Sequence, residues 1–170
     1  MRNRTGKNNS VRPTGSHLEM SNATTEQRSR IMRAVKGRDT GAERAVRSLV
    51  HGMGYRYSLR HKNLPGKPDI VFPSRQKVIF VHGCFWHGHK CARGDRVPKT
   101  NRDYWQRKIF RNTERDEATL SALRNANWRA LVVWECEIKD RDSLADRIQK
   151  FFGAAKIAGF LSSTRARTRV

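Results

Sequence analysis

The segment "VHGCFWHGHKC", residues 81–91, concentrates side chains that bind metals and transfer protons. It contains two cysteines and three histidines, together with two adjacent large aromatic residues. Structural zinc sites take four ligands from thiolate and imidazole groups, and a tight loop often supplies several of them. Cys84, His89 and Cys91 offer three such ligands within this one segment. The spacing therefore predicts most of a structural zinc site.

A fourth ligand has to come from elsewhere in the chain. Cys136 is the only other cysteine, and it follows the apolar run "LVVWEC", which is typical of a buried strand that could end beside the segment. Three cysteines are a poor basis for a disulfide framework and a reasonable ligand count in a reducing compartment. A closed set of four ligands is typical of a structural site. The alternative is three unrelated free thiols with surface histidines.

Two further histidines, His82 and His87, have no place in this ligand set. Asp69 stands in "LPGKPDIVF", where a turn with Gly66 and Pro68 puts its carboxylate at the start of a buried strand. One carboxylate with a backbone carbonyl or water suffices to hold Mg²⁺ against a phosphodiester. A nearby histidine could deprotonate the attacking water. The alternatives are a turn cap for Asp69 and ordinary core or surface positions for the histidines.

The charge balance indicates a polyanionic partner. The 170 residues include 36 Lys and Arg against 15 Asp and Glu, a formal net charge of +21. Such an excess attracts nucleic acid, because each neutralised phosphate releases condensed counterions. A solvated basic surface with basic tails is the alternative. No apolar run approaches the roughly 20 residues of a membrane span, and the amino-terminal residues lack the apolar core of a signal peptide. We expect a cytoplasmic protein that does not contact membranes.

Before the segment, the pattern predicts two helices and three strands. Residues 1–23 are polar and basic without apolar periodicity, which is typical of a disordered arm. A short basic helix is expected over residues 24–36. A second helix begins at Thr40, which can form a capping box with Glu43. Apolar alternation predicts strands in "YRYSLR", "DIVF" and "KVIFVHG", and "PSRQ" joins the last two as a hairpin.

After the segment, the pattern predicts a helix, a strand and a helix. A long helix is expected over residues 101–126, and its central face is polar where a core helix would be apolar: Asn112, Arg115 and Asp116. "WRALVVWEC" predicts a buried strand, and residues 154–170 a flexible basic tail. The order predicts one mixed α/β domain over residues 24–153, with a central sheet of about four strands flanked by helices.

These motifs together resemble the very short patch repair (Vsr) DNA mismatch endonucleases. The resemblance rests on "LPGKPDIVF", "KVIFVHGCFWHGHKC", "YW", "NTERD" and "WRALVVWEC", and it covers roughly residues 24–152. It implies a bacterial enzyme with a restriction-endonuclease-like fold that nicks double-stranded DNA beside T·G mismatches arising from deaminated 5-methylcytosine. Most nucleases of that fold carry (D/E)-x-K on the second catalytic strand. This chain has Phe80-Val81-His82 there, and a histidine at that place is what the family has.

The resemblance also implies roles for single residues. Asp69 and the backbone carbonyl of Val81 would bind Mg²⁺, His87 would be the general base, and His82 would contact the scissile phosphate. Glu43 would orient the active site, although a capping-box glutamate explains it equally well. The implied structural zinc ligands are those chosen above: Cys84, His89, Cys91 and Cys136.

A second implied set contacts DNA. A mismatch enzyme needs apolar wedges that enter the base stack and sense a weak step. The resemblance assigns this task to three aromatic residues and a methionine from the first helix: Phe85, Trp86, Trp105 and Met32. It also places two polar residues of the long helix, Lys108 and Asn112, close to the mispaired bases. Without the resemblance, core packing would be the preferred explanation of the aromatic residues.

Two other functions stay open on the sequence. The chain could be a zinc-stabilised DNA-binding module without catalysis, or a nuclease of the same fold that cuts ordinary duplex DNA. Asp69, His82 and His87 argue against a pure binder, which needs none of them. The expected partner is duplex DNA with a T·G mismatch, bound by a monomer, and repair-pathway protein partners stay open.

Overall fold

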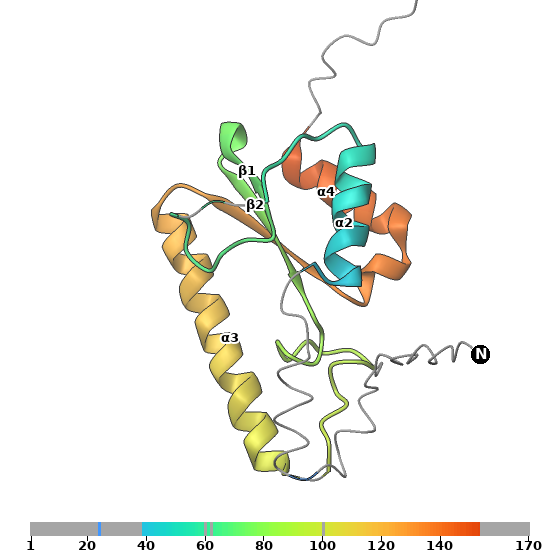
Figure 1. Cartoon of the computed structure of the whole chain (residues 1–170), viewed down its shortest axis with the longest axis vertical. Helices are drawn as coiled ribbons and strands as arrows, with labels where there is room; N and C mark the ends of the chain where they lie inside the picture. The colour runs from blue at the N-terminus through green and yellow to red at the C-terminus, as the bar shows by residue number, and fades with distance from the viewer. Residues whose placement is uncertain (1–23, 25–38, 60, 62, 100, 154–170) are drawn as a thin grey trace, which may run out of the picture.

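The computed structural model describes residue 24 and residues 39–59, 61, 63–99 and 101–153. Its elements are, in chain order, α2 (Gly41–Gly52), β1 (Ile70–Phe72), the 3₁₀ turn η1 (Pro73–Arg75), β2 (Lys77–His82), α3 (Arg102–Asn125), β3 (Arg129–Trp134), the 3₁₀ turn η2 (Glu137–Lys139) and α4 (Arg141–Phe152). Figure 1 shows their arrangement. The predicted arm, residues 25–36 of the predicted first helix with Met32, and the predicted tail lie outside the described residues.

The sheet is mixed, as the sequence predicts. Its order is β1-β2-β3, with β1 antiparallel and β3 parallel to the central strand β2. The predicted "PSRQ" connection is confirmed as the short turn η1, which Gln76 closes in the left-handed conformation. The α/β class and the mixed sheet are therefore confirmed.

The predicted strand in "YRYSLR" is wrong, so the described sheet has three strands. This segment contributes a single bridge, in which Ser58 and Val71 exchange two backbone hydrogen bonds of 2.8 Å. The Tyr55 N–H is already committed to the carbonyl of Val50 at the end of α2. The apolar alternation has another cause: the rings of Tyr55 and Tyr57 pack edge-on against Phe72.

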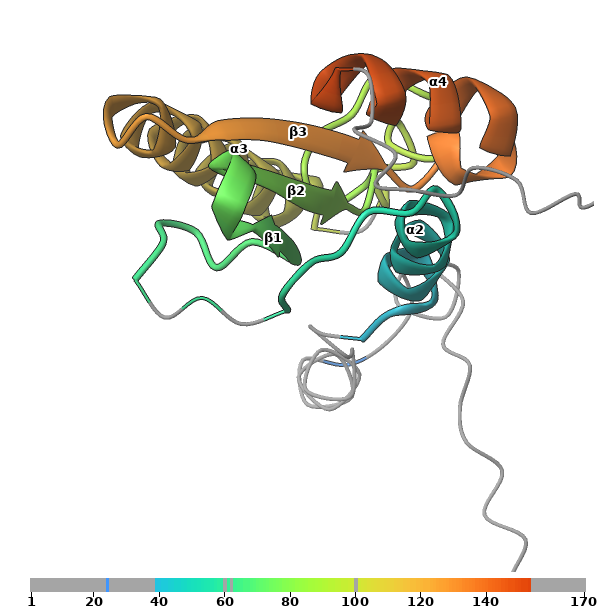
Figure 2. The same cartoon turned by 90° about the horizontal axis from the view of Figure 1, so that it is seen from above.

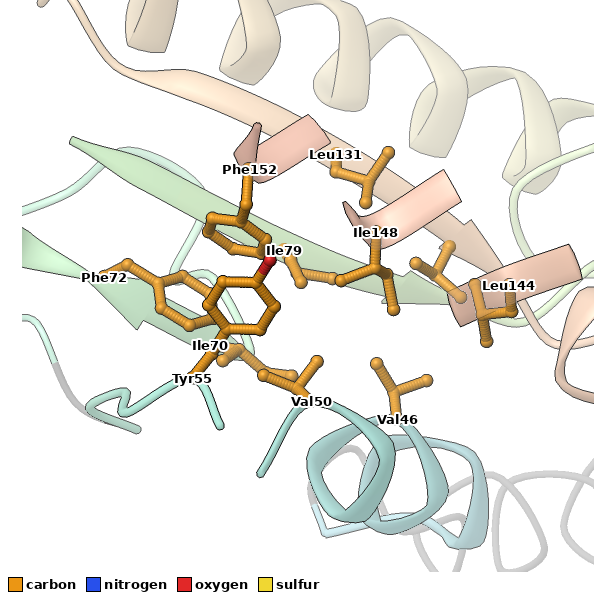
Figure 3. Close-up of a cluster of buried hydrophobic side chains, with 11 residues drawn as sticks. Val46, Val50, Tyr55, Ile70, Phe72, Ile79, Leu131, Leu144, Ile148 and Phe152 are labelled. Carbon is orange, nitrogen blue, oxygen red and sulfur yellow. The ribbon is translucent and has the colours of Figure 1, made fainter. Parts of the chain in front are cut away.

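Helices cover both faces of the sheet. Figures 1 and 2 show α3 on one side and α2 with α4 on the other. Along β2 the side chains alternate between the two faces, so that Ile79 belongs to the core under α2 and α4, whereas Val78 and Phe80 pack with Leu123 of α3. Figure 3 shows the larger core, formed by Val46, Val50, Tyr55, Ile70, Phe72, Ile79, Leu131, Val133, Leu144, Ile148 and Phe152.

The capping box fixes the start of α2. The Thr40 hydroxyl accepts the Glu43 N–H, and the Glu43 carboxylate accepts the Thr40 N–H, as the sequence predicts. The parallel pairing of β2 and β3 brings the carboxyl ends of both strands to one edge of the sheet. This edge, the start of α2 and the long helix α3 together position the site. No described helix is long and apolar enough to cross a membrane.

Candidate active site and metal centre

The Asp69 side chain continues the hydrogen bonding between β1 and β2 beyond their last backbone pair. Because β1 runs antiparallel to β2, the start of β1 lies beside the end of β2. The Asp69 carboxylate accepts the N–H of Val81 at 2.8 Å. Burial, with a smaller contribution from the nearby Glu43 carboxylate, raises the pKa of Asp69 to about 6, against the lowering effect of the Val81 hydrogen bond. A partly buried carboxylate of this kind gains much from a cation.

The two histidines outside the cysteine cluster stack on each other. The rings of His82 and His87 lie 3.8 Å apart between centroids, with planes inclined by 12°. His82 is buried, and burial together with the neighbouring His87 lowers the pKa of His82 to about 4. His82 is therefore neutral at physiological pH.

Asp116 of α3 contacts His87 and lies near His82. Its carboxylate oxygen lies 2.5 Å from Nδ1 of His87 and 3.8 Å from Nδ1 of His82. An ionised Asp116 accepts the Nδ1–H of His87 and leaves Nε2 as the ring atom with a free lone pair, which is the arrangement of a general base. No role in the site was predicted for Asp116. The only signal in the sequence was the polar centre of the long helix.

These groups open into one cleft of about 740 Å³. It is bounded by the start of α2, the turn before β1, the end of β2 and the middle of α3. The predicted site residues that line it are Glu43, Asp69, Val81, His82, Trp86, His87 and Lys108, and Asp116 lines it with them. The structure thus brings together in one cleft the predicted catalytic residues, which come from three separate parts of the chain.

Glu43 lies in the cleft wall but is turned toward its own helix. It is 4% exposed, and its carboxylate accepts the Asp39 N–H at 3.0 Å, the Thr40 hydroxyl at 3.0 Å and the Arg47 guanidinium at 2.7 Å. These donors occupy both oxygens. The capping alternative is therefore observed directly, and the contribution of Glu43 to the cleft is the charge that it places near Asp69.

The four predicted zinc ligands converge at the same sheet edge. One ligand atom from each of Cys84, His89, Cys91 and Cys136 lies within 4.8 Å of the other three, and Cys136 Sγ is 3.5 Å from His89 Nδ1. Ligands of a tetrahedral zinc ion at about 2.0–2.3 Å from the metal stand within about 4 Å of each other, so only small shifts are needed. The donor set of three thiols and one imidazole is one that zinc prefers.

The loop around this cluster is tightly closed. Gly94 donates its N–H to the Cys91 sulfur at 3.4 Å, and a Cβ at Gly94 would lie 1.7 Å from the carbonyl oxygen of His89. Burial raises the pKa of the Cys84 thiol to about 12. A zinc ion held here would have to displace that proton.

The aromatic residues divide into two groups. Phe85 is 4% exposed and Trp105 is 1% exposed, and the two rings pack together in a small core. Trp86 is half-buried and lines the cleft. Its carbonyl accepts the Asn112 side-chain amide at 2.8 Å, and Lys108 Nζ lies 5.6 Å from its ring. Phe85 and Trp105 are therefore core residues in the protein without DNA, as the alternative explanation by core packing predicts. Trp86 is partly exposed in the cleft.

Known proteins resemble the chain over most of its folded part. The family model of the DNA mismatch endonuclease Vsr matches residues 20–93. The type II nicking enzyme V.XorIIP of Xanthomonas oryzae pv. oryzae is 51% identical over 124 residues, which are 73% of this chain and 90% of that protein. The DNA mismatch endonuclease Vsr of Escherichia coli K12 is 44% identical over 119 residues, 70% of this chain and 76% of that protein. The type II nicking enzyme V.NmeAIP of Neisseria meningitidis is 38% identical over 135 residues, 79% of this chain and 96% of that protein.

Proposed function

The chain belongs to the Vsr family of DNA mismatch endonucleases, and on that premise we propose that it nicks one strand of double-stranded DNA next to a T·G mismatch. The observation that carries the proposal is the meeting of Asp69, His82, His87 and Asp116 in one cleft. A DNA-binding module has no need of a partly buried carboxylate beside a His–Asp pair. We further propose that residues 24–153 form the nuclease domain, with a restriction-endonuclease-like fold.

Asp69 and the carbonyl of Val81 would hold Mg²⁺. In an extended strand the N–H and C=O of one residue face the same edge, and the Val81 N–H faces Asp69. The Val81 carbonyl therefore faces that side too. The pairing of a carboxylate with a backbone oxygen and water suits Mg²⁺. When bound, the ion would stabilise the negative charge that develops on the phosphate and the leaving oxygen.

His87 is the proposed general base. Its Nε2 accepts a proton from the attacking water, and Asp116 orients the ring and stabilises the imidazolium that forms. His82, which is neutral, can donate a ring N–H to an oxygen of the scissile phosphate without a charge of its own. Glu43 supports the site indirectly, by fixing the start of α2 and by its charge near Asp69.

Cys84, His89, Cys91 and Cys136 would hold a structural zinc ion. The chemistry of the donor set and the closed loop support this assignment. Zinc at this edge would fix the loop that carries both His87 and Trp86 relative to β2 and β3. The metal would thus contribute rigidity to the site, and no proton transfer is assigned to its ligands.

Recognition of the mismatch is assigned to the part of the cleft that is lined by Trp86 and Lys108. Trp86, which lines the cleft, is the proposed main wedge that enters the base stack. Phe85 and Trp105 pack against Trp86 and are proposed to act with it. Lys108 and Asn112 are proposed to contact the mispaired bases beside Trp86. Met32, outside the described residues, is proposed to enter from the opposite groove.

One experiment tests the function. Matched and T·G-mismatched duplexes are incubated with the protein, with and without Mg²⁺, and any nick is mapped at nucleotide resolution. We expect a single nick beside the mismatched thymine that requires Mg²⁺. Equal nicking of matched DNA would support the general nuclease instead, and binding without any nick would support the DNA-binding module.

A further inference from the structure

The turn before Asp69 holds a lysine in an unfavourable backbone conformation. Lys67 has a φ of 53°, in the left-handed region that residues other than glycine seldom adopt. It also precedes Pro68, which restricts the backbone of the preceding residue further. Gly66, one residue earlier, has a φ of 72°. Two consecutive left-handed residues thus lead into Asp69.

The surroundings hold this turn in place. Gly66 packs so closely on α3 that a Cβ there would lie 2.2 Å from Cγ2 of Thr119. Pro68, on the other side of Lys67, is buried. An unfavourable conformation persists only where the surrounding structure imposes it, and such residues are concentrated at functional sites. Here the constraint keeps Lys67 in the wall of the cleft, two positions before the proposed Mg²⁺ ligand.

The cleft is lined by many carboxylates, so a basic side chain there that is not engaged in an ion pair can attract a phosphate. Its lining includes four carboxylates, Glu43, Asp69, Asp116 and Glu135, and three basic side chains, Lys67, Lys108 and Arg115. Lys108 lies against the rings of Trp86 and Tyr104. Lys67 is exposed, and no ion pair joins it to another described residue.

We propose that Lys67 binds the phosphate of the bond that is cut. The central strand ends in Phe80-Val81-His82, without a lysine or arginine. The approaching phosphodiester therefore meets mainly carboxylates at this end of the cleft, and an ammonium group there offsets the repulsion as a point charge. This inference rests on the proposed function and adds a phosphate-binding residue to it.

Glycine at position 67 provides the discriminating variant. Glycine adopts a φ near 53° without strain, so Lys67→Gly removes the ammonium group and keeps the turn. We expect an unchanged or higher Tm, a single-turnover nicking rate on T·G-mismatched duplex lower by at least about tenfold, and a Kd for the duplex changed by less than about threefold. Lys67→Arg should retain most of the rate. Lys150→Ala, at an exposed position of α4 outside the cleft, is the charge-matched control and should nick like the wild type.

The outcomes separate this inference from the proposed function. If the wild type nicks and Lys67→Gly nicks equally fast, the inference is wrong and the function stands. If Lys67→Gly lowers both the rate and Tm, and Lys67→Arg does not restore the rate, Lys67 is only structural and the inference is again wrong. A wild type that nicks neither duplex overturns the proposed function and the inference with it.

Discussion

Nδ1 of His87 lies 2.5 Å from the carboxylate of Asp116, although the two residues are 29 positions apart in the chain. One belongs to the loop after β2 and the other to the middle of α3. The contact explains why the centre of α3 is polar. The two ends of α3 pack on the sheet and on the aromatic core, whereas its centre faces the cleft with Asp116. It also makes Asp116 the residue whose replacement best tests the proposed base.

Replacing Asp116 by Asn should slow nicking and leave DNA binding intact. The amide keeps the shape but no longer stabilises the His87 imidazolium, so we expect a single-turnover rate lower by roughly ten- to a hundredfold, within the usual worth of general base catalysis. Glu117→Gln, the same change of charge at the next, exposed residue of α3, is the control and should be silent. Equal rates for the two variants would remove Asp116 from the mechanism.

Replacing Asp69 by Asn should abolish nicking and stabilise the protein. The pKa of Asp69 is about 6 in the folded protein against an ordinary value of 3.8, so the folded state binds more protons between these values. Stability is therefore lost as the pH rises through this window, because ionising the partly buried carboxyl is unfavourable. Near neutral pH and without Mg²⁺, Asp69→Asn should raise the free energy of unfolding by about 1–3 kcal/mol.

The pH dependence checks the cause of that gain. The stabilisation by Asp69→Asn should be about 1 kcal/mol larger near pH 8 than near pH 5, measured by urea unfolding in buffer free of Mg²⁺. Added Mg²⁺ should stabilise the wild type and not the variant. A gain that is the same at both pH values would show that burial of the Asp69 charge is not its source.

Replacing Cys136 by Ala should remove zinc. Purified wild type is expected to contain about one zinc per chain, and the variant little or none, with a lower Tm, because metal binding and folding of the loop are linked. Atomic absorption measures the metal. His61→Ala, a histidine outside the cluster, should keep the zinc. Full zinc content in Cys136→Ala would exclude the four-ligand assignment.

Replacing Trp86 by Ala should reduce discrimination more than affinity. The wedge senses base stacking, whereas lysine and arginine hold phosphates in any sequence. We expect the ratio of Kd values for matched and mismatched duplexes to move toward one, by about tenfold or more. Phe110→Ala removes an aromatic ring of α3 that is 62% exposed and should not change the ratio. An equal loss of affinity for both duplexes would leave Trp86 only a packing role.

Local patterns in the sequence were sufficient for most of the scaffold. Thr40 and Glu43 are three residues apart, and their capping box depends only on the helical geometry of that turn. The candidate metal cluster was also recognisable, because Cys84, His89 and Cys91 are close in the chain and Cys136 had no competitor among the cysteines. The strand expected in "YRYSLR" was wrong because a local pattern can have more than one cause. The tyrosines at alternate positions, Tyr55 and Tyr57, pack their rings on Phe72 without forming a strand.

The tertiary structure decided which side chains share the cleft and which way they face. Asp116 reaches His87 only because α3 packs on the sheet face beside the end of β2, and no local spacing encodes a contact between a loop and a distant helix. Glu43 lines the cleft because α2 packs on the sheet, whereas its contact with Arg47, four residues later in the same helix, is local. Composition and spacing determine which elements form and which residues can do chemistry. The packing of those elements determines the distances, the burial and therefore the pKa values on which that chemistry depends.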